Sequence, residues 1–143
     1  MNDVNTIQKE GNNPFILDTG SPHYVKISDN MPKSIFTAGR EIRYAEPFKG
    51  VGINVNFVVR KEDTIDVCTY ERGVEDETYS CGTGVVASAL ASIVDKNSGT
   101  YTITISTKGG QLQVSADKTD HHTYQNIRLI GPAIKVFKGS IAF

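Results

Sequence analysis

Alternation of apolar and polar residues, which is typical of strands, recurs along most of the chain. The segments that show it are residues 14–28, which predict two strands around a tight turn, and residues 51–60, 64–70, 101–106, 111–116, 124–130 and 134–137. In the segment 51–60, the apolar residues Ile53, Val55 and Phe57 fall on one face of the predicted strand. Asn54 and Asn56 fall on the other face, so two amide side chains point the same way.

Two segments depart from this alternation and predict helices. Residues 32–44 carry apolar side chains at a helical period, and Pro32 suits a first helical turn. Residues 82–95 are small or apolar on every side, which is typical of a helix surrounded by protein. Together the segments predict an α+β fold, in which a mostly antiparallel sheet curls around a central buried helix.

The remaining segments predict one domain. Residues 1–13 are polar and predict a loose lead-in, and residues 71–80 predict a loop with glycine and acidic residues. The five prolines are dispersed and no repeat interrupts the sequence, so we find no internal boundary. A chain of 143 residues that is 38% hydrophobic can bury a core of its own.

Charge and hydropathy narrow the classes of partner. The chain has 15 Lys and Arg against 16 Asp and Glu, a net charge of −1, which gives no reason to expect nucleic acid or an acidic membrane as partner. No apolar run approaches the ~20 residues that cross a bilayer, and the first residues lack the apolar stretch of a secretory signal. We therefore expect a cytoplasmic protein that acts on a small molecule.

The two cysteines differ in their sequence context. Cys68 lies inside a predicted strand, where a small buried apolar residue is the better interpretation. Cys81 immediately precedes the predicted buried helix, whose N-terminal dipole and free N–H groups favour a thiolate. A disulfide between the two is a weaker alternative, because a chain of this kind is expected in a reducing compartment.

Residues around Cys81 favour chemistry on a carboxylate-bearing substrate. Glycines flank Thr83, so a ligand could approach the backbone closely, and the N–H groups of Gly82 and Thr83 could hold a carboxylate. A thiolate beside a bound carboxylate is placed to act on the adjacent carbon. The alternative is that Cys81, like most free cysteines, is a small buried apolar residue.

Four more residues are candidates for the same site, each with a simpler alternative. His23, whose imidazole ordinarily titrates near ~6.5, and Glu71 could tune the acidity of the thiol, or could make only local hydrogen bonds. Arg72 offers a planar fork for a carboxylate, or a surface ion pair with an acid at 75–77. Asn54 could face a ligand or cap a sheet edge. The three histidines show no metal-ligand spacing, so we predict no metal.

Several motifs in this order resemble the diaminopimelate epimerases and cover nearly the whole chain. They are Thr19-Gly20-Ser21-Pro22-His23, Gly39-Arg40-Glu41-Ile42-Arg43-Tyr44, Gly52-Ile53-Asn54-Val55-Asn56-Phe57, Tyr70-Glu71-Arg72-Gly73, Glu77-Thr78, Ser80-Cys81-Gly82-Thr83-Gly84 and Gly131-Pro132-Ala133. The Cys-Gly-Thr-Gly stretch alone is weak evidence, because proline racemases and hydroxyproline epimerases are similar there. Its combination with the Glu-Arg-Gly and Asn-Val-Asn-Phe motifs is specific.

The resemblance implies a two-domain enzyme that interconverts LL- and meso-diaminopimelate, in lysine and cell-wall biosynthesis, without pyridoxal phosphate or another cofactor. Each pseudo-symmetric half is a sheet curled around a helix, and one cysteine from each half faces the α-carbon. By this likeness Cys81 is the acid/base of the second half. The residues implied in substrate binding are Ser21, Asn54, Glu71, Arg72, Gly82 and Thr83, with His23 and Glu71 tuning the thiol. Ser21 departs from the pattern, since many relatives carry asparagine there.

The first half of such an enzyme, with its own Cys-Gly-Asn-Gly motif, matches no part of this sequence. We therefore expect a C-terminal half-domain, excised or truncated, whose partner is the missing N-terminal half and whose Met1 is an internal methionine. The chain alone is expected to be inactive, and its exposed apolar surface is expected to drive a homodimer. Two other readings stay open, a proline or hydroxyproline racemase and a non-catalytic module that binds carboxylates.

Overall fold

The computed structural model describes residues 1–9, 11 and 14–142. Its strands are β1 (Gln8–Lys9), β2 (Phe15–Asp18), β3 (Pro22–Ile27), β4 (Asn54–Arg60), β5 (Thr64–Glu71), β6 (Asp76–Thr78), β7 (Gly99–Thr107), β8 (Gly110–Asp120) and β9 (Thr123–Ile130). Its helices are α1 (Ile35–Arg43) and α2 (Gly82–Ser92). Neither of these described helices is long and apolar enough to cross a membrane.

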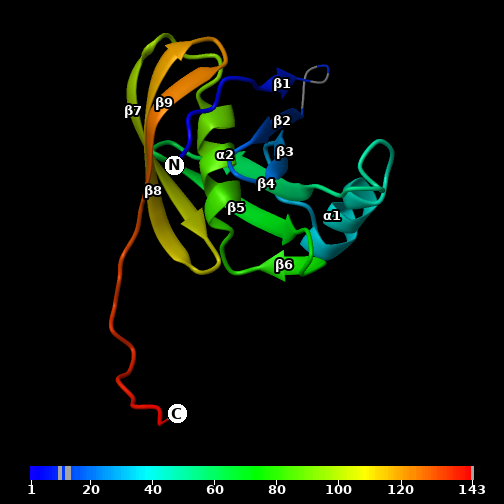
Figure 1. Cartoon of the computed structure of the whole chain (residues 1–143). Helices are drawn as coiled ribbons and strands as arrows, with labels where there is room; N and C mark the ends of the chain where they lie inside the picture. The colour runs from blue at the N-terminus through cyan, green and yellow to red at the C-terminus, as the bar shows by residue number, and fades with distance from the viewer. Residues whose placement is uncertain (10, 12–13, 143) are drawn as a thin grey trace.

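One sheet holds all of these strands and curls around α2 (Figure 1). The strand order is β1-β2-β3-β4-β5-β7-β8-β9, with β6 paired to β5. Most neighbours are antiparallel, and the pairs β3–β4 and β5–β7 are parallel. An antiparallel bridge between Val4 and Tyr124 ties the first residues to β9. The predicted α+β fold, a mostly antiparallel sheet around a central helix, is confirmed.

The helix α2 lies in the middle of the main core. Every residue from Gly84 to Ala91 is buried, as its all-round apolar sequence predicts. A second, smaller core lies on the outer face of the sheet, where α1 packs on β4 and β5. Strand β4 contributes to both, because Val55 and Phe57 face α1 whereas Val58 belongs to the core around α2.

The start of α1 lies later than predicted. Ser34 is its N-cap, and the Ser34 hydroxyl accepts from the backbone N–H of Thr37 over 3.1 Å. A hydroxyl at this position satisfies an N–H that the first turn leaves free, which a proline at position 32 cannot do. The helix contains Gly39 because a Cβ there would lie 2.3 Å from the Cβ of Tyr70 on β5. Glycine thus allows α1 to approach the sheet closely.

Three other expectations are corrected. The lead-in is not loose, since Val4 and Ile7 are buried in the main core; residues 10, 12 and 13 of it lie outside the described residues. The loop predicted at 71–80 contains β6, which pairs with the end of β5. The strand predicted at 134–137 is absent: residues 131–142 have no regular structure and extend away from the body of the chain (Figure 1). Alternation alone forms no strand when no neighbouring strand supplies the hydrogen bonds.

Candidate active site

Cys81 occupies the N-cap of the buried helix α2, as the sequence predicts. Its backbone is extended, with φ −112° and ψ 109°, and its carbonyl accepts from the N–H of Val85 over 2.8 Å. The thiol side chain caps no N–H group, and the residue is 9% exposed. The Sγ atom lies 3.6 Å from Oγ1 of Thr83, the second residue of the helix. The thiol therefore stands beside the N–H groups that the first turn of a helix leaves without internal partners.

His23 lies directly behind this first turn, on β3. It is fully buried, and its Nε2 is 2.9 Å from Oγ1 of Thr83. Burial lowers the pKa of His23 to about 4, while Asp18 acts to raise that pKa and Arg72 to lower it further. The ordinary titration near ~6.5 expected from the sequence is therefore wrong for this side chain. The imidazole is neutral near pH 7.

Glycine at position 84 lets the helix sit against this histidine. A Cβ on Gly84 would lie 2.4 Å from Oδ1 of Asn56 and 3.3 Å from Cε1 of His23. Contacts under 3.0 Å do not occur for a real Cβ, so a larger residue would push the helix away from β3 and β4. The second glycine of the Cys-Gly-Thr-Gly motif is required here by packing.

Asn54 is held by three hydrogen bonds at the start of β4. Its Nδ2 donates to Oγ of Ser21 over 2.8 Å and to the carbonyl of Pro22 over 3.0 Å, and its Oδ1 accepts from the N–H of Arg72 over 2.9 Å. Because β4 pairs with β3 on one side and β5 on the other, Asn54 does not cap a sheet edge. It joins the loop before β3 to the segment after β5.

Arg72 and Glu71 lie at the end of β5. The Arg72 guanidinium contacts backbone carbonyls, with Nη1 at 3.4 Å from the oxygen of Val51 and 3.5 Å from that of Gly52. Glu71 pairs with Asp76 of β6 and is partly buried. The structure thus brings Ser21, Asn54 and Arg72 together, and separately joins Cys81, Thr83 and His23.

The acid at position 75 belongs to a different network, which sequence reasoning missed. Glu75 has a φ of 60° and forms an ion pair with Arg43 at 3.3 Å. Its other oxygen accepts from the hydroxyls of Tyr44 and Tyr70 over 3.0 and 3.2 Å. The network fastens the C-terminal end of α1 to the loop that carries Arg72.

Sequence reasoning also missed three polar residues behind the candidate site. Thr19 donates to the carbonyl of Thr83 over 2.8 Å. Asn56 bonds His23 at 3.0 Å, and Thr69 donates to Asn56 over 2.9 Å. The signal for Asn56 was present, since it shares a strand face with Asn54. Thr69 could be recognised only from the strand register of the structure, in which it is paired with Asn56 across β4 and β5.

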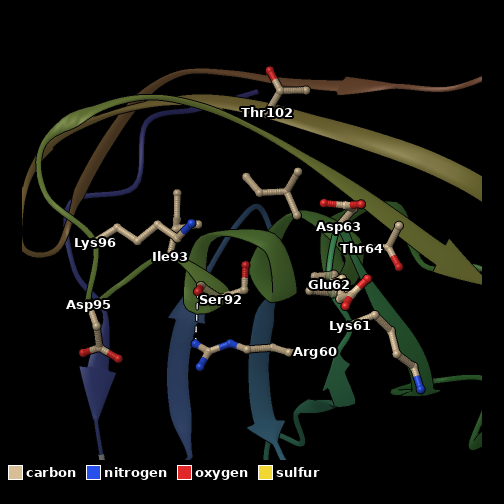
Figure 2. Close-up of a pocket in the computed structure, with 12 residues that line it drawn as sticks. Arg60, Lys61, Glu62, Asp63, Thr64, Ser92, Ile93, Asp95, Lys96 and Thr102 are labelled. Carbon is tan, nitrogen blue, oxygen red and sulfur yellow. Dashed lines mark hydrogen bonds between the residues drawn. The ribbon is translucent and has the colours of Figure 1, made fainter.

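A hollow at the other end of α2 is not part of this site. It has a volume of about 420 Å³, and Ser92, Ile93 and residues 60–65 line it (Figure 2). Arg60 donates to the carbonyl of Ser92 there over 3.0 Å. Eleven helical residues span about 16 Å, so this hollow is remote from Cys81. Within the described part of the chain, no three His, Cys, Asp or Glu side chains are grouped to hold a metal ion.

Cys68 has surroundings unlike those of Cys81. Both thiols are free, as expected. Cys68 is half-buried on the outer face of β5, where it packs against the core under α1. Burial, followed by the neighbouring Glu77, raises the pKa of the Cys68 thiol, which keeps that thiol protonated. These surroundings agree with a packing role for Cys68.

Comparison with known proteins identifies the family. The sequence profile described as "Diaminopimelate epimerase" matches residues 15–136. The chain belongs to this family. Diaminopimelate epimerase of Flavobacterium psychrophilum is 41% identical over 143 residues, which is 99% of this chain and 55% of the relative. That of Aquifex aeolicus is 38% identical over 128 residues, covering 88% of this chain and 45% of the relative. The chain thus spans about half the length of the curated diaminopimelate epimerases it matches.

Solved structures support the same fold. A probable proline racemase from Agrobacterium radiobacter aligns with a TM-score of 0.57 and 17% identity, over 77% of this chain and 38% of that one. A hydroxyproline epimerase from Agrobacterium vitis aligns with a TM-score of 0.53 and 16% identity, over 72% and 36%. At these identities the likeness concerns the fold alone, and it extends over little more than a third of each of the two solved chains.

Proposed function

We propose that this chain forms one half of the active site of a diaminopimelate epimerase, and that Cys81 is the acid/base of that half. The observation that carries the proposal is the position of the thiol, at the N-cap of a buried helix and within 3.6 Å of the Thr83 hydroxyl. Membership of the family supplies the reaction class, inversion at a carbon next to a carboxylate and an amine.

The chemistry divides between two thiols. The Cys81 sulfur, as a thiolate, would take the α-proton on one face of the substrate, and a thiol from the other half would give a proton to the opposite face; the reverse turnover exchanges these roles. The N–H groups of Gly82 and Thr83 at the helix start would bind the reacting carboxylate and stabilise the negative charge that forms on it. No pyridoxal phosphate is required in this scheme.

The second group of residues would hold the rest of the substrate. Asn54 already has its amide partnered by Ser21 and Arg72, so its role is to fix the loop on which Arg72 stands. The guanidinium of Arg72, whose contacts within the described part of the chain are long ones to carbonyl oxygens, would turn to a carboxylate of the substrate. Glu71, beside it, would contact the amino group and tune the thiol.

The proposed partner is the N-terminal half of the same type of enzyme, with its own cysteine. A joined protein tests this, in which the chain is fused to the part of the Flavobacterium psychrophilum relative that it does not cover. The joined protein is expected to convert LL- to meso-diaminopimelate, whereas the chain alone is expected to give no inversion. Cys81→Ala in the joined protein should lower turnover by about 10²–10⁴-fold, and Cys68→Ala should leave it unchanged.

Three results would contradict the proposal. Full turnover by Cys81→Ala would favour a non-catalytic module that binds carboxylates. Inversion of proline or hydroxyproline, but not of diaminopimelate, by the folded joined protein would favour the racemase reading. Robust inversion by the chain alone would show that one thiol suffices.

A further inference from the structure

The side-chain amide of Asn56 is held in one orientation under the first turn of α2. Its Nδ2 donates to the backbone carbonyl oxygen of Tyr24 over 3.1 Å, and a carbonyl oxygen can only accept. Its Oδ1 accepts from the hydroxyl of Thr69 over 2.9 Å. The partners therefore assign the nitrogen and the oxygen of this amide. The same Nδ2 lies 3.0 Å from Nδ1 of His23 and donates to it.

This donation selects one tautomer of His23. A neutral imidazole carries one proton, and when Nδ1 accepts, that proton is on Nε2. The ring is neutral near pH 7 because it is fully buried; the charged groups that act on it are Asp18 and Arg72, with opposite effects. Its Nε2–H then donates to Oγ1 of Thr83, 2.9 Å away.

The Thr83 hydroxyl links His23 to the Cys81 sulfur. Since the hydroxyl oxygen accepts from His23, its own proton is free for a second partner, and Sγ of Cys81 is 3.6 Å away. We propose that Asn56 is a positioning residue that fixes the tautomer of His23, so that Thr83 donates its hydroxyl proton to the Cys81 sulfur. Each residue in this series, from Thr69 through Asn56, His23 and Thr83, then donates a hydrogen bond to the next, and the last acceptor is the Cys81 sulfur.

The arrangement favours the thiolate without placing a positive charge beside it. A hydrogen bond donated to the charged form of a group stabilises that form. His23 acts here as a neutral donor through Thr83, and Asn56 acts through His23. The inference rests on the proposed function in one respect, namely that the thiolate of Cys81 is the form that reacts.

The first test reads the tautomer directly and needs no variant. Side-chain nitrogen resonances of His23 in the ¹⁵N-labelled chain are expected to show a bare Nδ1 and a protonated Nε2 at pH 7. The exposed His121 and His122 serve as internal references in the same spectra. A protonated Nδ1, or an imidazolium at pH 7, would overturn the proposal.

The second test titrates the Cys81 thiol by the ultraviolet absorbance of its thiolate, in a Cys68→Ala background that leaves one cysteine. Thr83→Val removes the hydroxyl and is expected to raise the midpoint of the titration by roughly one pH unit. Thr83→Ser keeps the hydroxyl and should restore the midpoint. Charged groups at this end of the sheet, Asp18, Glu71 and Arg72, are the same in all variants.

Asn56→Ala is also expected to raise the midpoint of the Cys81 titration, because Nδ1 of His23 then loses the donor that fixes its tautomer. Combining Asn56→Ala with Thr83→Val should add no further shift, because both substitutions act through the same series of hydrogen bonds. An unchanged midpoint in Thr83→Val, or additive shifts in the double variant, would overturn the proposal. These readouts use the chain alone and no substrate, so they stand apart from the inversion assay, whose failure would concern the proposed function instead.

Discussion

Burial decides what His23 can contribute. The side chain has no exposure to solvent, and among the described residues its ring bonds to two uncharged groups, Asn56 and Thr83. Removing an imidazolium from water with no carboxylate in contact is costly, so the neutral form prevails and the pKa falls to about 4. A residue that would titrate near neutrality on the surface becomes a fixed hydrogen-bonding element.

This shift predicts a pH-dependent stability. Between pH 6.5 and about 4 the unfolded chain binds a proton at position 23 that the folded chain does not, so stability is full above pH 6.5 and falls as the pH is lowered. From pH 7 to pH 5 the linkage amounts to about 2 kcal/mol in the free energy of unfolding. Urea unfolding at both pH values should show this loss in the natural chain.

Two variants isolate the effect. In His23→Gln, the loss of unfolding free energy between pH 7 and pH 5 should be smaller by about 2 kcal/mol, because glutamine does not titrate. This difference is expected whatever the stability of the variant at pH 7. His121→Gln, at an exposed position, should leave the loss as it is. Equal losses in the natural chain and in His23→Gln would show that His23 is not the group responsible.

The sequence allowed prediction of those site residues whose surroundings are local. Cys81 precedes an apolar helix, and that context is sufficient to expect a thiol at a helix start. Asn56 and Thr69 could not be selected in this way. Their importance depends on the parallel register of β3 with β4 and the antiparallel register of β4 with β5, which juxtapose residues more than ten positions apart.

At the scale of elements, α2 is held at both ends by different means. Its N-terminal end carries Cys81 and packs through Gly84 on the Asn56–His23 pair. Its C-terminal end meets Lys118, a buried lysine of β8 whose Nζ donates to the carbonyls of Ile93, Val94 and Lys96. A positive charge at this end complements the helix dipole. The lysine thus fixes the helix whose other end carries the candidate thiol.

Replacing this lysine should destabilise the whole fold. Lys118→Met keeps the length of the side chain but leaves the carbonyls of Ile93, Val94 and Lys96, which follow α2, without this donor. We therefore expect the free energy of unfolding to fall by about 3 kcal/mol. Lys26→Met, at an exposed position of β3, should change it by less than about 0.5 kcal/mol. Urea unfolding of both variants checks this; similar values would mean that the Lys118 bonds contribute little.

The sequence predicted the elements whose own residues show a strong periodicity. It did not predict those whose formation depends on pairing with a neighbouring strand. The hairpin of β7 and β8 and the helix α2 follow from their own residues. Strand β6 is three residues long and exists because the end of β5 lacks another partner on that side. The expected strand at 134–137 has the right alternation but no neighbour, so it forms none. Pairing, which periodicity does not encode, separates these two cases.

For the whole molecule, the first and last segments behave differently. The first residues close the sheet, since Val4 bridges Tyr124 and the N-terminal ammonium donates to the carbonyl of Ile127 over 3.0 Å. The segment 131–142 leaves four large apolar side chains more than 80% exposed, which are Ile134, Val136, Phe137 and Ile141. Exposed apolar residues of this density are typical of a surface that another protein covers.

In the absence of a second half, this segment is expected to associate with itself. The chain should form a homodimer at high concentration, and a variant that ends at residue 131 should shift toward the monomer, because the four apolar side chains are gone. Since residues 132–142 are exposed throughout and form no strand, the truncation should leave the free energy of unfolding of the monomer unchanged. Sedimentation velocity over a range of concentrations measures the association, and urea unfolding at low concentration provides the control. A clean monomer at high concentration would rule out the homodimer. Equal association with and without the segment would instead place the dimer contact on the curled sheet.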